Sequence, residues 1–171
     1  MLSSLVASFE VLRPDVDEQP YPGEPARGLV QRLALSKLRA VLRPDCHVVA
    51  ADTVAALEGR IFGQPANLEE ARSNLAFLAG RRFEVFTATA FKAPTGPVCS
   101  HLSTNQLAMK SWGDGELADY LASGLWQGRA GGFSIAAPES PVTLLDGELD
   151  AVRGLSTAWL NECLRKAGYA V

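Results

Sequence analysis

A carboxylate that directly follows an apolar run is the first residue of this chain that could do chemistry. Residues 47–51 are almost continuously apolar, which predicts a buried strand, and Asp52 and Thr53 come next. Binding crevices of α/β folds usually open at the carboxyl ends of strands, and a hard cation such as Mg²⁺ takes oxygen ligands of this kind. Asp52 therefore predicts either a reactive or metal-binding site, or a turn whose backbone the carboxylate caps.

Two further charged residues could join Asp52. Lys37 follows Leu33 by four residues in a predicted helix, so its side chain starts near the apolar stripe. It either extends its ammonium into solvent or pairs with an anion in a cleft. Glu18 belongs to the acidic stretch 15–18, which is either a solvated loop or, beside a bound metal, the source of a ligand or a base.

Arginines and histidines give weaker signals. Arg82 follows the end of a predicted helix, where positive charge also suits the helix dipole. Arg129 lies among small residues at 128–132, which would let a guanidinium approach a phosphate but equally suit a glycine turn. His47 and His101 have no Cys or carboxylate partner at a suggestive spacing, and both are interpreted as structural. No P-loop, dinucleotide fingerprint or Gly-x-Ser-x-Gly elbow is present.

The elements that must position these residues follow from periodicity and turn signals. Apolar spacing of three to four residues predicts helices over residues 24–42, 68–79, 114–123 and 155–167. Shorter apolar or alternating runs predict strands at 9–12, 47–51, 82–93, 98–110, 131–135 and 142–145, with a hairpin at 59–63. Because helices and strands mix without regular alternation, we expect one α/β domain with a mixed sheet flanked by helices.

Composition bounds the class of protein. The chain has 171 residues, 47% of them hydrophobic, which suits a single domain with its own core. A net charge of −3 argues against a nucleic-acid polymer as partner, because such binders usually carry a basic face. Cys46, Cys99 and Cys163 form no metal-binding spacing and are expected to be reduced. No apolar run is long enough to cross a membrane, so we expect a cytoplasmic protein.

Taken in order, several segments resemble the Maf-like nucleoside triphosphate pyrophosphatases. Residues 50–54 and 59–65 are similar to that family's ADTVV and G-x-ILGKP motifs. The similarity continues over nearly the whole chain: an acidic loop at 15–18, A-x-x-K at 34–37, a helix ending in Gly-Arg-Arg at 69–82, a strand at 86–90, the SGEW-x-GKAGGYAIQG run at 120–136 and VVGLP at 152–155.

The resemblance implies an elongated, mixed sheet flanked by helices and an enzyme that cleaves nucleoside triphosphates to monophosphate and pyrophosphate. It implies a divalent cation, Mg²⁺ or Mn²⁺, a possible homodimer and a link to septum formation. Carried over by motif, Asp52 and Glu18 would hold the metal or activate water. Lys37 would face phosphate and Arg129 stands where the family has Lys, while the motifs around them place Thr53, Gln64 and Arg82 in the substrate site.

This chain also departs from the family's pattern. Gln64 replaces the Lys of the KP motif and Ala136 the Gln of IQG, and other family residues are replaced by Leu125, Phe83 and Ala151. The resemblance aligns Met1 with the helix after the family's first strand and its Ser-x-Arg-Arg phosphate loop, so we expect residues 1–171 to lack both. Three alternatives follow: an active pyrophosphatase, a catalytically degenerate relative that binds nucleotide or a partner, or a chain whose true start lies upstream.

Overall fold

A five-stranded antiparallel sheet forms the body of the protein. The computed structural model describes residues 1–169, and its strand order is β2-β1-β3-β4-β5. The strands are β1 (Val48–Leu57), β2 (Arg60–Phe62), β3 (Arg82–Lys92), β4 (Val98–Met109) and β5 (Val142–Asp146). Each pairing is antiparallel. The predicted α/β class is confirmed, but strand direction is not mixed, because tight turns join β1 to β2 and β3 to β4 as hairpins.

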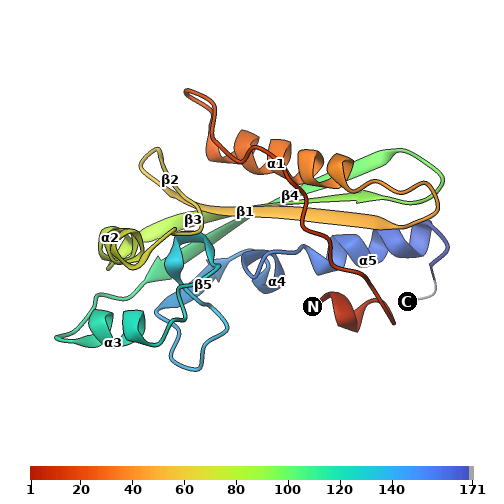
Figure 1. The fold of residues 1–171 in the computed structure, drawn as a ribbon. Coiled ribbons are helices and arrows are strands. Elements are labelled where there is room, and N and C mark those ends of the chain that lie inside the picture. Colours follow the sequence, from red (N-terminus) through yellow and green to blue (C-terminus); the bar gives the residue numbers. More distant parts are fainter. Residues whose placement is uncertain (170–171) are drawn as a thin grey trace.

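Helices cover both faces of this sheet (Figure 1). They are α1 (Ala26–Ala40), α2 (Leu68–Leu78), α3 (Glu116–Ala122), α4 (Leu149–Val152) and α5 (Thr157–Lys166), with short 3-10 turns η1 (Leu2–Ser4) and η2 (Ala130–Gly132). In Figure 1, α1 lies on one face and α4 and α5 lie on the other. No helix among residues 1–169 is long and apolar enough to span a bilayer.

Alternation along β3 divides the core between the two faces. Phe86, Ala88 and Ala90 pack against α1, whose buried Leu29, Val30, Leu33 and Leu38 recur at helical spacing. Phe83 and Val85 face the other way, toward α2 and α3, and Phe91 on that same side packs against α5. The same alternation governs β1, so neighbouring residues of β1 reach opposite faces of the sheet.

Most predicted elements are confirmed, and their end signals work as expected. The side chain of Asn67 accepts a hydrogen bond from the Glu70 N–H at 2.9 Å and caps α2. Gly80, with φ +69°, follows the end of that helix. The three cysteines are free, as expected.

Two predicted strands are wrong. Residues 131–135 begin in η2 because Gly131 and Gly132 have φ of +68° and +78°, which a strand cannot contain. Residues 9–12 pair with no strand among the described residues, and Phe9 and Val11 remain exposed. An apolar run alone cannot make a strand without an edge to pair with.

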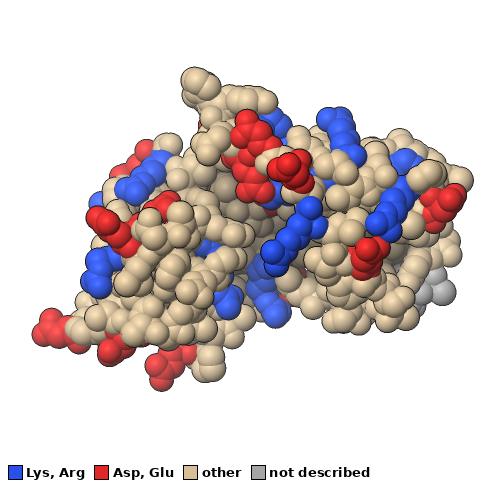
Figure 2. Space-filling model, in the orientation of Figure 1, with Lys and Arg blue, Asp and Glu red and all other residues tan. Residues whose placement is uncertain are grey.

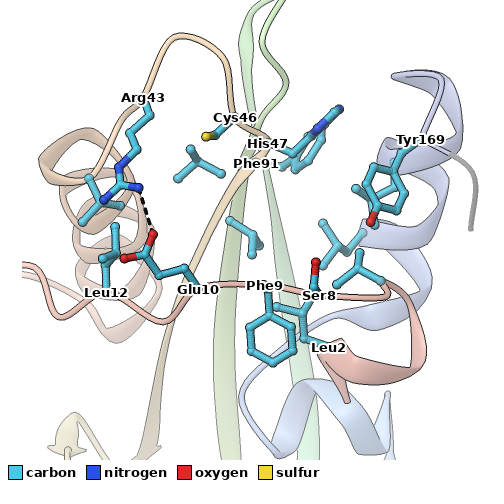
Figure 3. A pocket seen from close by; sticks show the side chains of 16 residues that line it. Leu2, Ser8, Phe9, Glu10, Leu12, Arg43, Cys46, His47, Phe91 and Tyr169 are labelled. Atoms are coloured by element: carbon cyan, nitrogen blue, oxygen red, sulfur yellow. Dashed lines mark hydrogen bonds and ion pairs between the residues drawn. The ribbon is translucent and has the colours of Figure 1, made fainter.

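The N-terminal segment instead crosses the side of the molecule and walls a small hollow of about 340 Å³ (Figure 3). Glu10 and Arg43 form an ion pair of 2.8 Å at its rim. His47 stacks on the Phe91 ring and meets the edge of Tyr169, which supports its structural interpretation. His101 is likewise stacked on Trp159. The hollow is lined mainly by apolar side chains.

Candidate active site

A larger hollow of about 940 Å³ opens at a free edge of the sheet. β2 pairs with β1 only from Ala55 to Leu57, so residues 48–54 have no partner on their outer side among the described strands. Asp52 and Thr53 lie on this stretch and line the hollow. Figure 2 shows the hollow in the middle of this face, with acidic side chains gathered above it and Lys or Arg side chains below it.

The position of Asp52 corrects the sequence interpretation. The predicted strand stops at residue 51, but β1 continues through Asp52 to Leu57 and pairs residue by residue with β3. Asp52 is opposite Ala88, which packs on the α1 side of the sheet, and Thr53 is opposite Thr87 on the other face. The carboxylate therefore sits in mid-strand at a sheet edge, and the hollow wraps around that edge.

Lys37 joins two carboxylates at this edge. Its Nζ donates to Asp52 Oδ1 at 2.7 Å and lies 2.8 Å from Glu18 Oε1. The Asp52 side chain is 9% exposed, that of Lys37 18% and that of Glu18 59%. Of the two alternatives for Lys37, extension into solvent or pairing in a cleft, the structure has the second.

Burial and charge act against each other in this cluster. Burial raises the pKa of Asp52 above its ordinary value of 3.8, and the Lys37 hydrogen bond and charge only partly offset it. Burial also acts to lower the pKa of Lys37, but the hydrogen bonds and charges of Asp52 and Glu18 together outweigh it, so the net shift is upward. Both pKa values rise because Asp52 is the deepest group and Glu18 adds a second negative charge. The Lys37 ammonium is therefore firmly protonated and already neutralised.

Arg32 of α1 holds the loop that carries Glu18 in place. Arg32 Nε and Nη2 donate to the two Glu24 oxygens at 2.8 Å each, and Arg32 Nη2 also donates to the Gln19 carbonyl at 2.9 Å. The Arg32 hydrogen bond is the largest cause that lowers the Glu24 pKa to about 2. The backbone next to Glu18 is thus tied to the same helix that carries Lys37.

Thr53 is fixed by a chain of buried hydrogen bonds. Thr87 Oγ1 donates to the Ala151 carbonyl at 2.7 Å and lies 2.9 Å from Thr53 Oγ1. Because the Thr87 proton is used on Ala151, Thr53 must donate to Thr87. The free lone pairs of Thr53 then make it a hydrogen-bond acceptor toward a ligand.

The loop around η2 brings two more predicted residues to the hollow. The Gly131 N–H donates to the Gly63 carbonyl at 2.9 Å, which ties the glycine-rich loop to the segment after β2. Arg129 and Gln64, on either side of this bond, both line the hollow. Arg129 takes part in none of the ion pairs found among residues 1–169.

Arg82 does not join these residues. It begins β3, six residues before Ala88, the partner of Asp52, which corresponds to roughly 20 Å along a strand. It is exposed and is not part of the lining of the hollow. Of the positions where the chain departs from the family motifs, Ala136 lines the hollow, whereas Phe83 is buried in the core.

Sequence reasoning missed Arg153, which lines the hollow together with Gly154. The available signal was an arginine within residues 152–155, where the resembled VVGLP motif is apolar. Glu70 also reaches the lining, but its carboxylate accepts the Ala66 N–H at 2.8 Å.

The carboxylates of the hollow suit a cation held jointly with a ligand. Among the described residues, no group of three or more His, Cys, Asp or Glu is placed to hold a metal by itself. Glu18 and Asp52 nevertheless converge on one point, the Lys37 Nζ, so two carboxylate oxygens already face a cation. Mg²⁺ is commonly bound by one or two carboxylates, with phosphates and water completing its shell.

Comparison with known proteins identifies a family and several similar sequences. The Maf-like protein family matches residues 1–167. A dTTP/UTP pyrophosphatase of Novosphingobium aromaticivorans is 39% identical over 175 aligned residues, which cover 100% of this chain and 87% of the relative. Proteins of the same name from Zymomonas mobilis and Cereibacter sphaeroides are 37% and 40% identical, covering 94% and 92% of this chain and 81% and 83% of the relatives.

Proposed function

This chain belongs to the Maf-like protein family, and we propose that it hydrolyses nucleoside triphosphates to nucleoside monophosphate and pyrophosphate. The observation that carries the proposal is the convergence of Asp52, Lys37 and Glu18 at the edge of a hollow large enough for a nucleotide. These are the residues that the motifs assign to the chemistry, and they come from three separate segments of the chain.

The substrates that fit best are dTTP and UTP. Three relatives, each at least 37% identical over most of this chain, carry the name dTTP/UTP pyrophosphatase. The Thr53 oxygen, which can only accept from a ligand, suits an N–H or hydroxyl of such a nucleotide.

Asp52 and Glu18 would hold Mg²⁺ or Mn²⁺ together with the triphosphate. A bound divalent cation would neutralise phosphate charge and stabilise the departing pyrophosphate. The chain's own contribution begins with Asp52, a buried carboxylate at the edge of the hollow that would orient the attacking water or accept its proton. Lys37 keeps the two carboxylates together and faces the hollow, with its charge balanced by them.

The second candidate is a binding module that has lost catalysis. It is favoured by Gln64 and Ala136, which line the hollow where the resembled motifs carry Lys and Gln. Phosphoryl transfer depends on positioning and charge, and the loss of one stabilising donor costs about 10²- to 10³-fold in comparable cases. Both candidates would bind the nucleotide, but only the first would hydrolyse it.

A panel of nucleoside triphosphates with Mg²⁺ or Mn²⁺ distinguishes them. We expect pyrophosphate release, with the highest kcat/KM for dTTP and UTP, and loss of release when the metal is chelated. Asp52→Asn should remove activity, whereas Asp114→Asn, an exposed acidic residue outside the hollow, should leave it unchanged. Nucleotide binding by wild type without any turnover would favour the binding module.

Residence in the cytoplasm, a homodimer and a link to septum formation remain predictions.

A further inference from the structure

One positively charged side chain that lines the hollow of the proposed active site, Arg153, is assigned no role by any of the motifs. Its lining contains three Lys or Arg side chains, Lys37, Arg129 and Arg153. Lys37 is bound to two carboxylates at 2.7 and 2.8 Å, so its charge is already balanced. A triphosphate carries several negative charges, and their balance must then come largely from the other two side chains and any bound cation.

Arg153 is only weakly paired within the protein. Its Nη1 lies 3.5 Å from Asp150 Oδ1, and both side chains are about two-fifths exposed, at 41% and 38%. The other Asp150 oxygen accepts a hydrogen bond of 2.6 Å from Thr157 Oγ1. An exposed ion pair this long contributes little, so the guanidinium is free to take an anion.

The backbone that carries Arg153 is fixed even though its side chain is free. Thr87 Oγ1 donates to the Ala151 carbonyl at 2.7 Å, and the Glu148 N–H donates to the buried Asn105 side chain at 2.8 Å. The Arg153 N–H completes α4 by donating to the Leu149 carbonyl at 3.1 Å. Both ends of this short helix are thus tied to β3 and β4. A Cβ added at the next residue, Gly154, would lie 3.9 Å from Thr53 Oγ1 of β1, and Arg153 lines the same hollow as Thr53.

Arg153 and Lys37 reach the hollow from opposite faces of the sheet. Lys37 belongs to α1, and Arg153 directly follows α4 on the other face (Figure 1). A ligand lying along the free edge of β1 would therefore meet Lys37 and its carboxylates on one side and Arg153 on the other. Guanidinium groups bind phosphate oxygens in a bidentate manner, which a lysine cannot reproduce.

We propose that Arg153 is a phosphate-binding residue of this site and holds the polyphosphate of the substrate together with Arg129. The proposal rests on the proposed function for the identity of the substrate, but the anion site itself does not depend on turnover. Arg153 also adds a positive charge to the hollow, where Gln64 is neutral and the resembled motif has Lys.

The test combines binding with turnover. Binding of inorganic tripolyphosphate is measured by calorimetry in the presence of Mg²⁺ for wild type, Arg153→Ala and Arg153→Lys. Arg165→Ala, which removes an exposed arginine of α5 outside the hollow, is the charge-matched control. We expect Arg153→Ala to weaken binding on the order of 10- to 100-fold, the usual effect of losing charged hydrogen bonds. Arg153→Lys should recover part of the affinity, and Arg165→Ala should bind as wild type does.

Turnover separates failure of this proposal from failure of the proposed function. If wild type releases pyrophosphate and Arg153→Ala matches Arg165→Ala in both binding and KM, Arg153 is not a phosphate ligand and the enzyme assignment stands. If wild type releases no pyrophosphate, the enzyme assignment fails, and the calorimetry still decides whether Arg153 binds the anion. Equal affinities of Arg153→Ala and wild type for tripolyphosphate would overturn the proposal in either case.

Discussion

Lys37 stabilises a buried negative charge as well as facing the hollow. Asp52 is 9% exposed and its closest cationic partner is Lys37 Nζ at 2.7 Å, so removing the ammonium leaves the carboxylate buried without compensation. Lys37 can therefore be tested for its effect on stability separately from its effect on activity. Its effect on stability should disappear when the Asp52 carboxylate is also removed, because no buried charge is then left to balance.

The prediction is that Lys37→Met lowers the free energy of unfolding by about 1–3 kcal/mol, less than for a fully buried pair because the hollow admits water. The double variant Lys37→Met with Asp52→Asn should recover much of that loss while remaining inactive. Urea unfolding measures both. Lys110→Met, which breaks an exposed ion pair of 3.1 Å with Glu116, is the control and should have a much smaller effect. Equal losses in the single and double variants would mean that the buried charge is not the cause.

The raised pKa of Asp52 predicts a specific dependence of stability on pH. Burial favours the protonated form in the folded state, so the folded-state pKa lies above 3.8. The contribution of Asp52 to stability is then fully present below pH 3.8 and is lost as the pH rises through its folded-state pKa. Asp52→Asn, which stays neutral, should remove this component of the slope.

Unfolding free energies of wild type and Asp52→Asn, measured from pH 3 to 7, test the sign. The difference between the two should change with pH, to the disadvantage of wild type as the pH rises. Parallel stability curves for the two proteins would contradict the assigned pKa direction.

The elements of the fold show what sequence patterns specify and what they leave open. The stripe of Leu29, Val30, Leu33 and Leu38 gave α1 correctly, because a helix can satisfy its hydrogen bonds within one segment. A strand depends on its neighbour. The apolar run before Asp52 predicted only half of β1, since the ladder with β3 continues through the polar residues Asp52 and Thr53.

The site residues were found mainly through motifs rather than through geometry. Asp52, Lys37 and Glu18 were named from the sequence, but nothing in their spacing indicated that one ammonium would bridge both carboxylates. Arg153 was missed because its approach to the hollow depends on the tertiary hydrogen bonds that hold α4. Such long-range contacts leave no local pattern in the chain.

The glycine-rich turn η2 offers a prediction at this scale. Gly131 has φ +68°, and an added Cβ would come within 2.7 Å of the Phe133 ring. Gly131→Ala should therefore displace the loop that carries Arg129, raise KM for the nucleotide and lower the free energy of unfolding. Gly124→Ala is the matched control, because it has a similar φ of +72° but no contact closer than 3.9 Å.

Both substitutions are expected to lose about 1–2 kcal/mol from the left-handed backbone conformation. Only Gly131→Ala should lose more than that and also change KM. Steady-state kinetics beside urea unfolding decide the matter, and an unchanged KM in Gly131→Ala would show that this loop does not position the substrate.

At the scale of the whole molecule, the free edge of β1 explains why the site lies where it does. A long antiparallel sheet covered on both faces leaves few openings, and β2 covers only the last three residues of β1. Side chains from opposite faces can line one hollow only around such an edge, as Lys37 and Arg153 do. Composition and periodicity predicted the overall class and the helices that cover the sheet. The free edge could not be predicted in this way, because it depends on how many residues of β1 pair with β2, which no local sequence pattern specifies.

The central claim is that this hollow cleaves a nucleoside triphosphate between its α and β phosphates. The most direct measurement is phosphorus NMR of the products when wild type or Asp52→Asn is incubated with dTTP and Mg²⁺. Wild type should yield dTMP and pyrophosphate in equal amounts, and Asp52→Asn should yield neither. Formation of dTDP and orthophosphate, or no product from a folded wild-type protein that binds the nucleotide, would contradict the account.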